Sequence, residues 1–146
     1  MQTEKPILAI DYGQKRIGLA ISDSKGIIAS PLDVLRITDR HGVNKILEDI
    51  LLIVDEYRVK SILIGMPQQF EYSYSKSINK IKSFAKKLAD MTDKPIIFQD
   101  ESYSTTQAQN MLLSLGQSTR SSKGKIDMIS ATLFLQEFLN SNNKQK

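Results

Sequence analysis

The chain has 146 residues and a formal net charge of +4, with a pI near 9.2, and its length suits one ordinary domain. Cysteine is absent, which excludes thiolate zinc sites, cysteine nucleophiles and disulfides, and the one histidine, His41, is interpreted as a solvated turn residue. The start lacks a signal-peptide pattern and no apolar stretch approaches the roughly 20 residues of a membrane span, so we expect a cytoplasmic protein.

Three predicted strands open the chain. Residues 7–10 are apolar on both faces, as in a central buried strand, and this strand ends at Asp11. Alternating apolar residues predict a second strand over 16–22, and a third follows over 27–35. Pro31 cannot donate to a ladder, so the third strand should lie at a sheet edge or carry a bulge. The expected opening is an antiparallel meander.

Helices and strands alternate through the middle of the chain. Apolar residues recur at helical spacing from Val43 to Tyr57 and from Ile78 to Leu88, which predicts two amphipathic helices. Short buried strands are predicted at 61–65 and 95–99. Parallel pairing through right-handed crossovers then gives a mixed five-stranded sheet of the α/β class.

The last third is predicted to hold two more helices. Residues 104–107 form a capping box for the first of them, and Gly116 suits its end. The Ser, Thr, Gly and Lys content of 117–124 predicts a flexible loop. A largely apolar helix is predicted from near Lys125, and the tail 140–146 is expected to fray and be flexible.

Basic residues gather in two places, and both favour a polyanionic partner. One group lies along the second predicted helix and consists of Lys76, Lys80, Lys82, Lys86 and Lys87. The other lies in and just after the loop before the last helix and consists of Arg120, Lys123 and Lys125. An ordinary solubilising lysine face explains the helix equally well, but it explains the loop less well.

Three carboxylates stand where a folded chain normally avoids them. Asp11 ends an apolar strand, Glu101 follows another, and Asp127 lies in the first turn of an apolar helix. Burial of unpaired anions is costly, so each needs a cation, a donor or water. Because the carboxyl ends of parallel strands meet at one crevice, Asp11 and Glu101 are expected to be neighbours, and the chain is long enough for Asp127 to join them.

Oxygen ligands of this kind are what Mg²⁺ prefers, and two such ions can cleave a phosphodiester without a histidine base. Taken singly, each carboxylate also has an ordinary explanation. Asp11 could form a turn, Glu101 could cap one, and Asp127 could favour a helix dipole.

Four motifs, in order along nearly the whole chain, resemble the YqgF family of Holliday-junction resolvases, also regarded as nucleases that mature the 5′ end of pre-16S rRNA. They are DYGQKRIGLA at 11–20, IGMP at 64–67, DESYST at 100–105 and KGKID at 123–127. Two departures bear on substrate binding. Ser102 stands where the family usually carries Arg, and the loop after Gly65 lacks the family's small acidic pattern.

The resemblance implies an RNase H-like domain over residues 1–146, with strand order 3-2-1-4-5 and about four helices. It implies that Asp11, Glu101 and Asp127 are catalytic and hold Mg²⁺ or Mn²⁺, with two ions in the site. It also implies a set of residues that contact nucleic acid; these are Lys15, Arg16, Thr105, Lys123 and Lys125.

The expected function is therefore metal-dependent cleavage of structured RNA, most directly 5′-end maturation of pre-16S rRNA in ribosome biogenesis. The alternatives are a nuclease for branched DNA, a catalytically silent nucleic-acid-binding or ribosome-assembly factor, and an ATPase of the actin and sugar-kinase type, which needs two domains. The ribosome is a further candidate partner, and the chain is expected to be a monomer or a homodimer, the symmetric dimer suiting a four-way junction. Phe70, Tyr72 and Tyr74 could stack on bases, join subunits or be partly buried.

Overall fold

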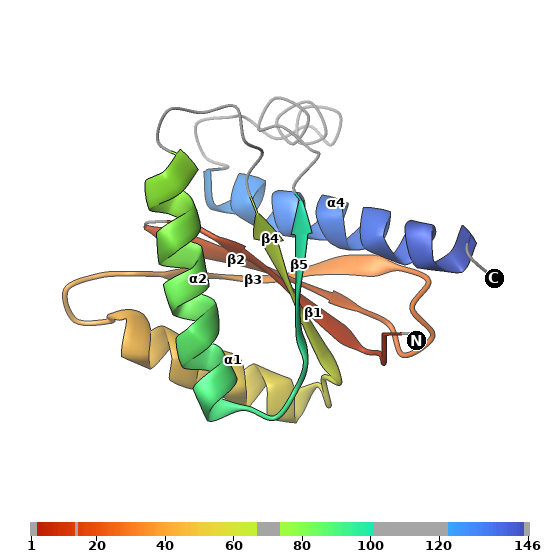
Figure 1. Ribbon diagram of the computed structural model, residues 1–146, viewed down its shortest axis with the longest axis horizontal. Coiled ribbons are helices and arrows are strands. Elements are labelled where there is room, and N and C mark those ends of the chain that lie inside the picture. The colour runs from red at the N-terminus through yellow and green to blue at the C-terminus, as the bar shows by residue number, and fades with distance from the viewer. Residues whose placement is uncertain (1–2, 14, 67–73, 101–122, 145–146) are drawn as a thin grey trace.

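The computed structural model of the chain describes residues 3–13, 15–66, 74–100 and 123–144, with the main chain alone for 74–77, 100, 123–128 and 142–144. Five strands in this part form one sheet in the order β3-β2-β1-β4-β5 (Figure 1). β1 pairs antiparallel with β2, as does β2 with β3, whereas β1 with β4 and β4 with β5 are parallel. The predicted mixed sheet is confirmed; its strands are β1 (Ile7–Tyr12), β2 (Arg16–Ser22), β3 (Ala29–Arg36), β4 (Ser61–Met66) and β5 (Ile96–Asp100).

The edge strand β3 carries the irregularity that its proline predicts. Leu19 pairs with Asp33 while Ala20 pairs with Pro31, so Leu32 is an extra residue on β3. The strand begins two residues later than predicted. The main-chain N–H groups of Ile27 and Ile28 donate to the Asp23 carboxylate, at 2.7 and 3.1 Å, which uses them in a turn instead of a ladder.

Helices cover both faces of the sheet. α1 (Val43–Glu56) and α2 (Tyr74–Met91) lie on one face, and α4 (Lys123–Lys144) crosses the other (Figure 1). Side chains along β1 point alternately to the two faces of the sheet. Leu8 and Ile10 belong to the core under α1 and α2, whereas Ile7 and Ala9 pack under α4. No helix within the described ranges is long and apolar enough to cross a membrane.

The bounds of α4 correct two expectations. Lys123 and Gly124 are helical, so the predicted loop 117–124 is wrong at its last two residues. The helix also continues to Lys144, where a flexible tail was expected, because Leu139 is fully buried and holds the last turns on the sheet. The rest of that loop and the helix expected over 104–116 lie outside the described residues.

His41 lies in the turn before α1, as expected, but it is also partly buried and contacts that helix. Its Nε2 lies 2.8 Å from Oδ2 of Asp49 on α1, and its side chain is 35% exposed. Lys45 reaches the other oxygen of the same carboxylate at 3.4 Å. The sequence did not show this contact because the turn before α1 sets it.

Candidate functional site

Asp11 is the last residue but one of β1, at the edge where the parallel strands end. It is half-buried and pairs with Gly18 of β2. Ile7 and Ala9, which precede it by four and two residues, pack under α4, so strand alternation directs Asp11 to the α4 face. The carboxylate therefore stands where the buried layer under α4 reaches solvent.

Glycine stands beside Asp11 on both neighbouring strands. Gly18 is its partner on β2, and Gly65 of β4 is level with it when the pairing of Ile10 with Ile64 is continued by one residue. Gly65 in turn pairs with Gln99 of β5. Glycine in a strand often marks a place where a ligand or another backbone approaches closely, and here no side chain stands directly beside Asp11 on either neighbouring strand.

The turn after Asp11 is fixed by a close backbone approach. The N–H of Gly13 donates to the carbonyl of Arg16 at 3.0 Å, and a Cβ at Gly13 would lie only 2.5 Å from that oxygen. The N–H of Ile37 donates to the carbonyl of Lys15 at 2.8 Å, which ties the turn to the end of β3. Only glycine fits position 13, and the turn presents an exposed Lys15 next to the candidate acid.

Two arginines meet at the same edge. Arg16 precedes Gly18 by two residues, so it shares the face of Asp11, and its partner across the ladder is Arg36 of β3. Like charges directly opposite each other are unfavourable in a sheet, so this pairing calls for an anionic group nearby, from the protein or from a ligand. Sequence reasoning predicted Lys15 and Arg16 but missed Arg36, because the bulge at Leu32 sets its register.

Tyr12 serves packing on the opposite face. Its ring centroid lies 4.7 Å from that of Phe84 on α2, with the ring planes 54° apart. Burial raises the pKa of the Tyr12 phenol, so the hydroxyl stays protonated at neutral pH. Tyr12 thus anchors the end of β1 to α2.

The other predicted site residues are described only in part. The main chain of Lys123, Lys125 and Asp127 lies in the first turns of α4, whereas Glu101 and Thr105 lie outside the described residues, as do Ser102 and Arg120. Asp100 ends β5 level with Met66 of β4. Among the described side chains, no three His, Asp or Glu groups gather closely enough to hold a metal ion.

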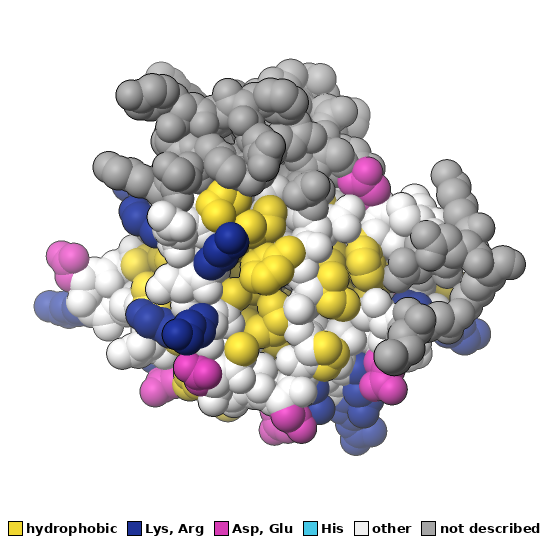
Figure 2. Space-filling model, viewed as in Figure 1, with side chains coloured by type: hydrophobic (Ala, Val, Ile, Leu, Met, Phe, Trp, Pro, Cys, Tyr) yellow, Lys and Arg dark blue, Asp and Glu magenta, His cyan; other side chains and the backbone are white. Residues whose placement is uncertain are grey.

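Exposed basic side chains lie along α2, as the sequence predicted. Figure 2 shows basic side chains beside an apolar area between α2 and β5. Those with described side chains are Lys80, Lys82, Lys86 and Lys87, and none of the four forms an ion pair within the described ranges. Phe98 and Met91, at 45% and 46% exposed, contribute apolar surface there. The aromatic loop with Phe70 and Tyr72 lies outside the described residues.

Comparisons with known proteins agree with the fold. A Thermus thermophilus RuvC structure superposes with a TM-score of 0.61 at 14% identity, over 96% of this chain and 97% of that one. A fowlpox virus resolvase, solved with Holliday junction DNA, gives a TM-score of 0.56 at 16% identity over 94% and 98% of the two chains. The sheet order and these neighbours show the RNase H-like fold.

Sequence relatives give the family. A curated protein of Halothermothrix orenii, named "Putative pre-16S rRNA nuclease", is 36% identical over 138 residues, covering 94% of this chain and 96% of that protein. A protein of the same name from Rickettsia typhi is 34% identical over 136 residues, covering 93% and 85%. The family model described as "RuvX: Holliday junction resolvase" matches residues 5–141. With its motifs, its fold and these matches in agreement, the chain belongs to the RuvX family of Holliday junction resolvases, which is the YqgF family.

Proposed function

We propose that this chain, as one RNase H-like domain over residues 1–146, is an endonuclease that hydrolyses phosphodiester bonds in structured nucleic acid. The observation that carries this function is the setting of Asp11, half-buried at the carboxyl edge with glycine on both neighbouring strands. A carboxylate in such a setting has room for a ligand, and the adjoining turn supplies Lys15 and Arg16 for phosphate. Family membership supports the same reaction.

We assign Asp11, Glu101 and Asp127 as the catalytic acids. Glu101 follows β5 directly, and β5 is separated from β1 by β4 alone. The position of α4 supports the third member. Gln136 accepts from the N–H of Ala29 at 2.9 Å and donates to the carbonyl of Ile27 at 2.9 Å, which fixes the later half of the helix beside the start of β3.

Lengths along the helix and the strand then agree. Ala29 pairs with Ser22, whose hydroxyl accepts from the N–H of Ile7, so Gln136 is level with the beginning of β1. Residue 127 precedes Gln136 by nine residues, about 13 Å of helix. Asp11 follows Ile7 by four residues, about 13 Å of strand. This match supports an assignment of Asp127 to the same level as Asp11.

The donor set fits Mg²⁺ or Mn²⁺, because three carboxylates at an open, glycine-lined edge offer oxygen ligands and room for water. Two such ions supply an activated water and stabilise the leaving oxygen. The chain's own residues hold the ions and orient the phosphate. For the second task we assign Arg36 together with the predicted contacts, which are Lys15, Arg16, Thr105, Lys123 and Lys125.

The substrate that we propose is the 5′ end of pre-16S rRNA, in the cytoplasm and with the ribosome as a candidate partner, because the curated relatives carry that name. Branched DNA is the second candidate, because neighbours of the same fold were solved with Holliday junctions. Both substrates present phosphates in unusual shapes and neither requires that base edges be recognised. A four-way junction would suit a homodimer, whereas pre-rRNA is compatible with a monomer.

Cleavage of a precursor RNA with an extended 5′ end and of a four-way DNA junction, each with Mg²⁺, Mn²⁺ or EDTA, tests the function. We expect cleavage that needs the metal and prefers the RNA. Asp11→Asn should lower the rate by about a thousandfold or more, since metal-ion catalysis contributes several kcal/mol. Asp90→Asn, which removes an exposed carboxylate from the last turn of α2, is the matched control and should cleave normally.

The outcomes separate the alternatives. Undiminished cleavage by a folded Asp11→Asn protein would reject the assigned site. If the native chain binds RNA tightly without cleaving it, the result would instead support a catalytically silent binding role. In that case Ser102→Arg, which restores the residue that the family usually carries, is the first variant to assay for cleavage.

A further inference from the structure

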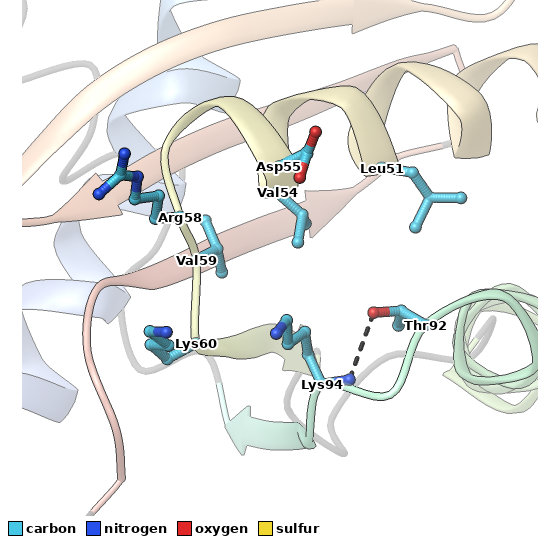
Figure 3. A pocket seen from close by; sticks show the side chains of 8 residues that line it. All are labelled: Leu51, Val54, Asp55, Arg58, Val59, Lys60, Thr92 and Lys94. Atoms are coloured by element: carbon cyan, nitrogen blue, oxygen red, sulfur yellow. Dashed lines mark hydrogen bonds between the residues drawn. The ribbon is translucent and has the colours of Figure 1, made fainter.

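A pocket of about 370 Å³ opens where β4 and β5 begin, at the other end of the strands from Asp11 (Figure 3). It lies between the end of α1 and the residues that lead into β4 and β5. Leu51, Val54 and Val59 give it an apolar wall, and three cations line it as well; these are Arg58, Lys60 and Lys94. Its size is within the range of small-molecule sites.

Two of these cations come shortly before the paired strands β4 and β5. Ile62 pairs with Ile96, and its N–H donates to the carbonyl of Pro95 at 2.9 Å. Lys60 and Lys94 each come two residues before this pair, just outside the ladder, and both line the pocket. Cations that line one pocket repel each other, and a bound anion relieves this repulsion.

Acidic side chains do not compensate the cations of the pocket. Within the described residues, Arg58 and Lys60 form no ion pair, and Lys94 reaches only Asp93, at 3.7 Å, whose side chain is 92% exposed. Asp55 also lines the pocket, but Figure 3 shows its carboxylate on the far side from the two lysine ammonium groups. The pocket therefore carries a net positive charge.

Capping of α1 is the ordinary explanation for basic residues after a helix, and the backbone already performs it. The N–H groups of Tyr57, Arg58 and Val59 donate to the carbonyls of Ile53, Asp55 and Val54, at 2.9, 3.3 and 2.9 Å. Arg58 adopts φ +54°, in the left-handed region where helices usually place glycine. Arginine stands here at a position that favours glycine, and such backbone strain is often found where a side chain has a functional use.

We propose that this pocket binds a nucleotide phosphate, with the cations on the phosphate and the apolar wall against the attached nucleoside. The phosphate could come from the backbone of a bound nucleic-acid strand or from a free mononucleotide. The site lies at the other end of the strands from the proposed acids, so it does not depend on the catalytic assignment.

Titration of the ¹⁵N-labelled full chain in EDTA, which prevents metal-dependent cleavage, tests the proposal with two probes. The probes are adenosine monophosphate, followed by amide chemical shifts and thermal stability, and a 12-nucleotide single-stranded RNA, followed by fluorescence anisotropy. The double variant Lys60→Gln, Lys94→Gln removes the charges of the two pocket lysines. Lys25→Gln with Arg40→Gln, at exposed positions outside the pocket, removes the same charge and is the control.

We expect adenosine monophosphate to shift amides around Val59 and to raise the melting temperature of the native chain and the control, but not of the pocket variant. If the RNA is the ligand, the pocket variant should bind it about tenfold more weakly than the control, and its slope of log K against log salt should be smaller by about 1.4. RNA binding equal to the control, with loss of the mononucleotide effect, would identify a free nucleotide as the ligand.

The proposal is overturned if neither probe distinguishes the pocket variant from the control. Both double variants should remain folded, because Lys60, Lys25 and Arg40 are exposed and Lys94 is only partly buried. If the pocket variant nevertheless unfolds, Lys94→Gln alone repeats both titrations. Loss of cleavage in the earlier assay would leave these binding results intact, so the two proposals fail separately.

Discussion

The two ends of β1 are built differently. At its start, Ile7 is fully buried and its N–H donates to the hydroxyl of Ser22 at 2.8 Å. At its end, Asp11 is half-buried, and the adjacent positions on the neighbouring strands are glycines that add no side-chain packing. One strand thus has an end whose packing stabilises the fold and an end with a carboxylate that has no side chain directly beside it on the neighbouring strands, a division expected where a site is placed on a rigid sheet.

The largest expected effect is on activity at the open end. Gly18→Ala puts a methyl group beside Asp11, and we expect cleavage to fall by about a hundredfold, since small displacements of a reacting group cost that much. The melting temperature, measured on the same protein, separates this loss from unfolding, because Gly18 is buried and the added methyl group must be accommodated. Unchanged cleavage rates together with normal stability would show that the space beside Asp11 has no catalytic use.

The closed end should respond in stability instead. Ser22→Ala removes the acceptor for the buried N–H of Ile7 and should cost about 1 to 3 kcal/mol of unfolding free energy, measured by urea denaturation. Ser61→Ala is the matched control. It is also buried, but its Oγ has no hydrogen-bond partner in the described part of the chain, so its loss should be neutral or stabilising. Equal losses in the two variants would mean that burial alone, without the hydrogen bond, sets the effect.

The smallest expected effect is the pH dependence of the turn that follows Ser22. Hydrogen bonds from the main-chain N–H groups of Ile28 and Ile27 hold the pKa of Asp23 below its ordinary value. A carboxyl whose pKa is lower in the folded state stabilises the fold above its unfolded pKa, and this contribution disappears as the pH falls through the folded pKa. Melting curves from pH 6 to pH 2 should therefore show Asp23→Asn less stable than the native chain near neutrality. The difference should vanish in acid; a constant difference would assign the effect to shape rather than to charge.

Much of this fold could be predicted because its patterns are local. The apolar run before Asp11, the spacing from Val43 to Tyr57 and the position of Pro31 each predicted an element or its irregularity, and the structure confirms them. Errors fell at element ends, as at Ile27 and after Asn140, where a single side-chain interaction decides whether the backbone stays regular; these are the Asp23 carboxylate at Ile27 and the burial of Leu139 before Asn140. The partnership of His41 with Asp49 was missed for the same reason.

The sequence by itself determined which side chains can do chemistry: the acids Asp11, Glu101 and Asp127 stand out because carboxylates beside apolar runs are costly, and their joint assignment as metal ligands stays a prediction. Only the tertiary structure decided which residues are brought together, namely Gly18 and Gly65 around Asp11, Arg36 opposite Arg16, and Lys60 and Lys94 in one pocket. The physical reason is register. Pairing between strands is set by packing on both faces and by a bulge of one residue, so residues distant in the chain become neighbours only when the whole sheet has formed.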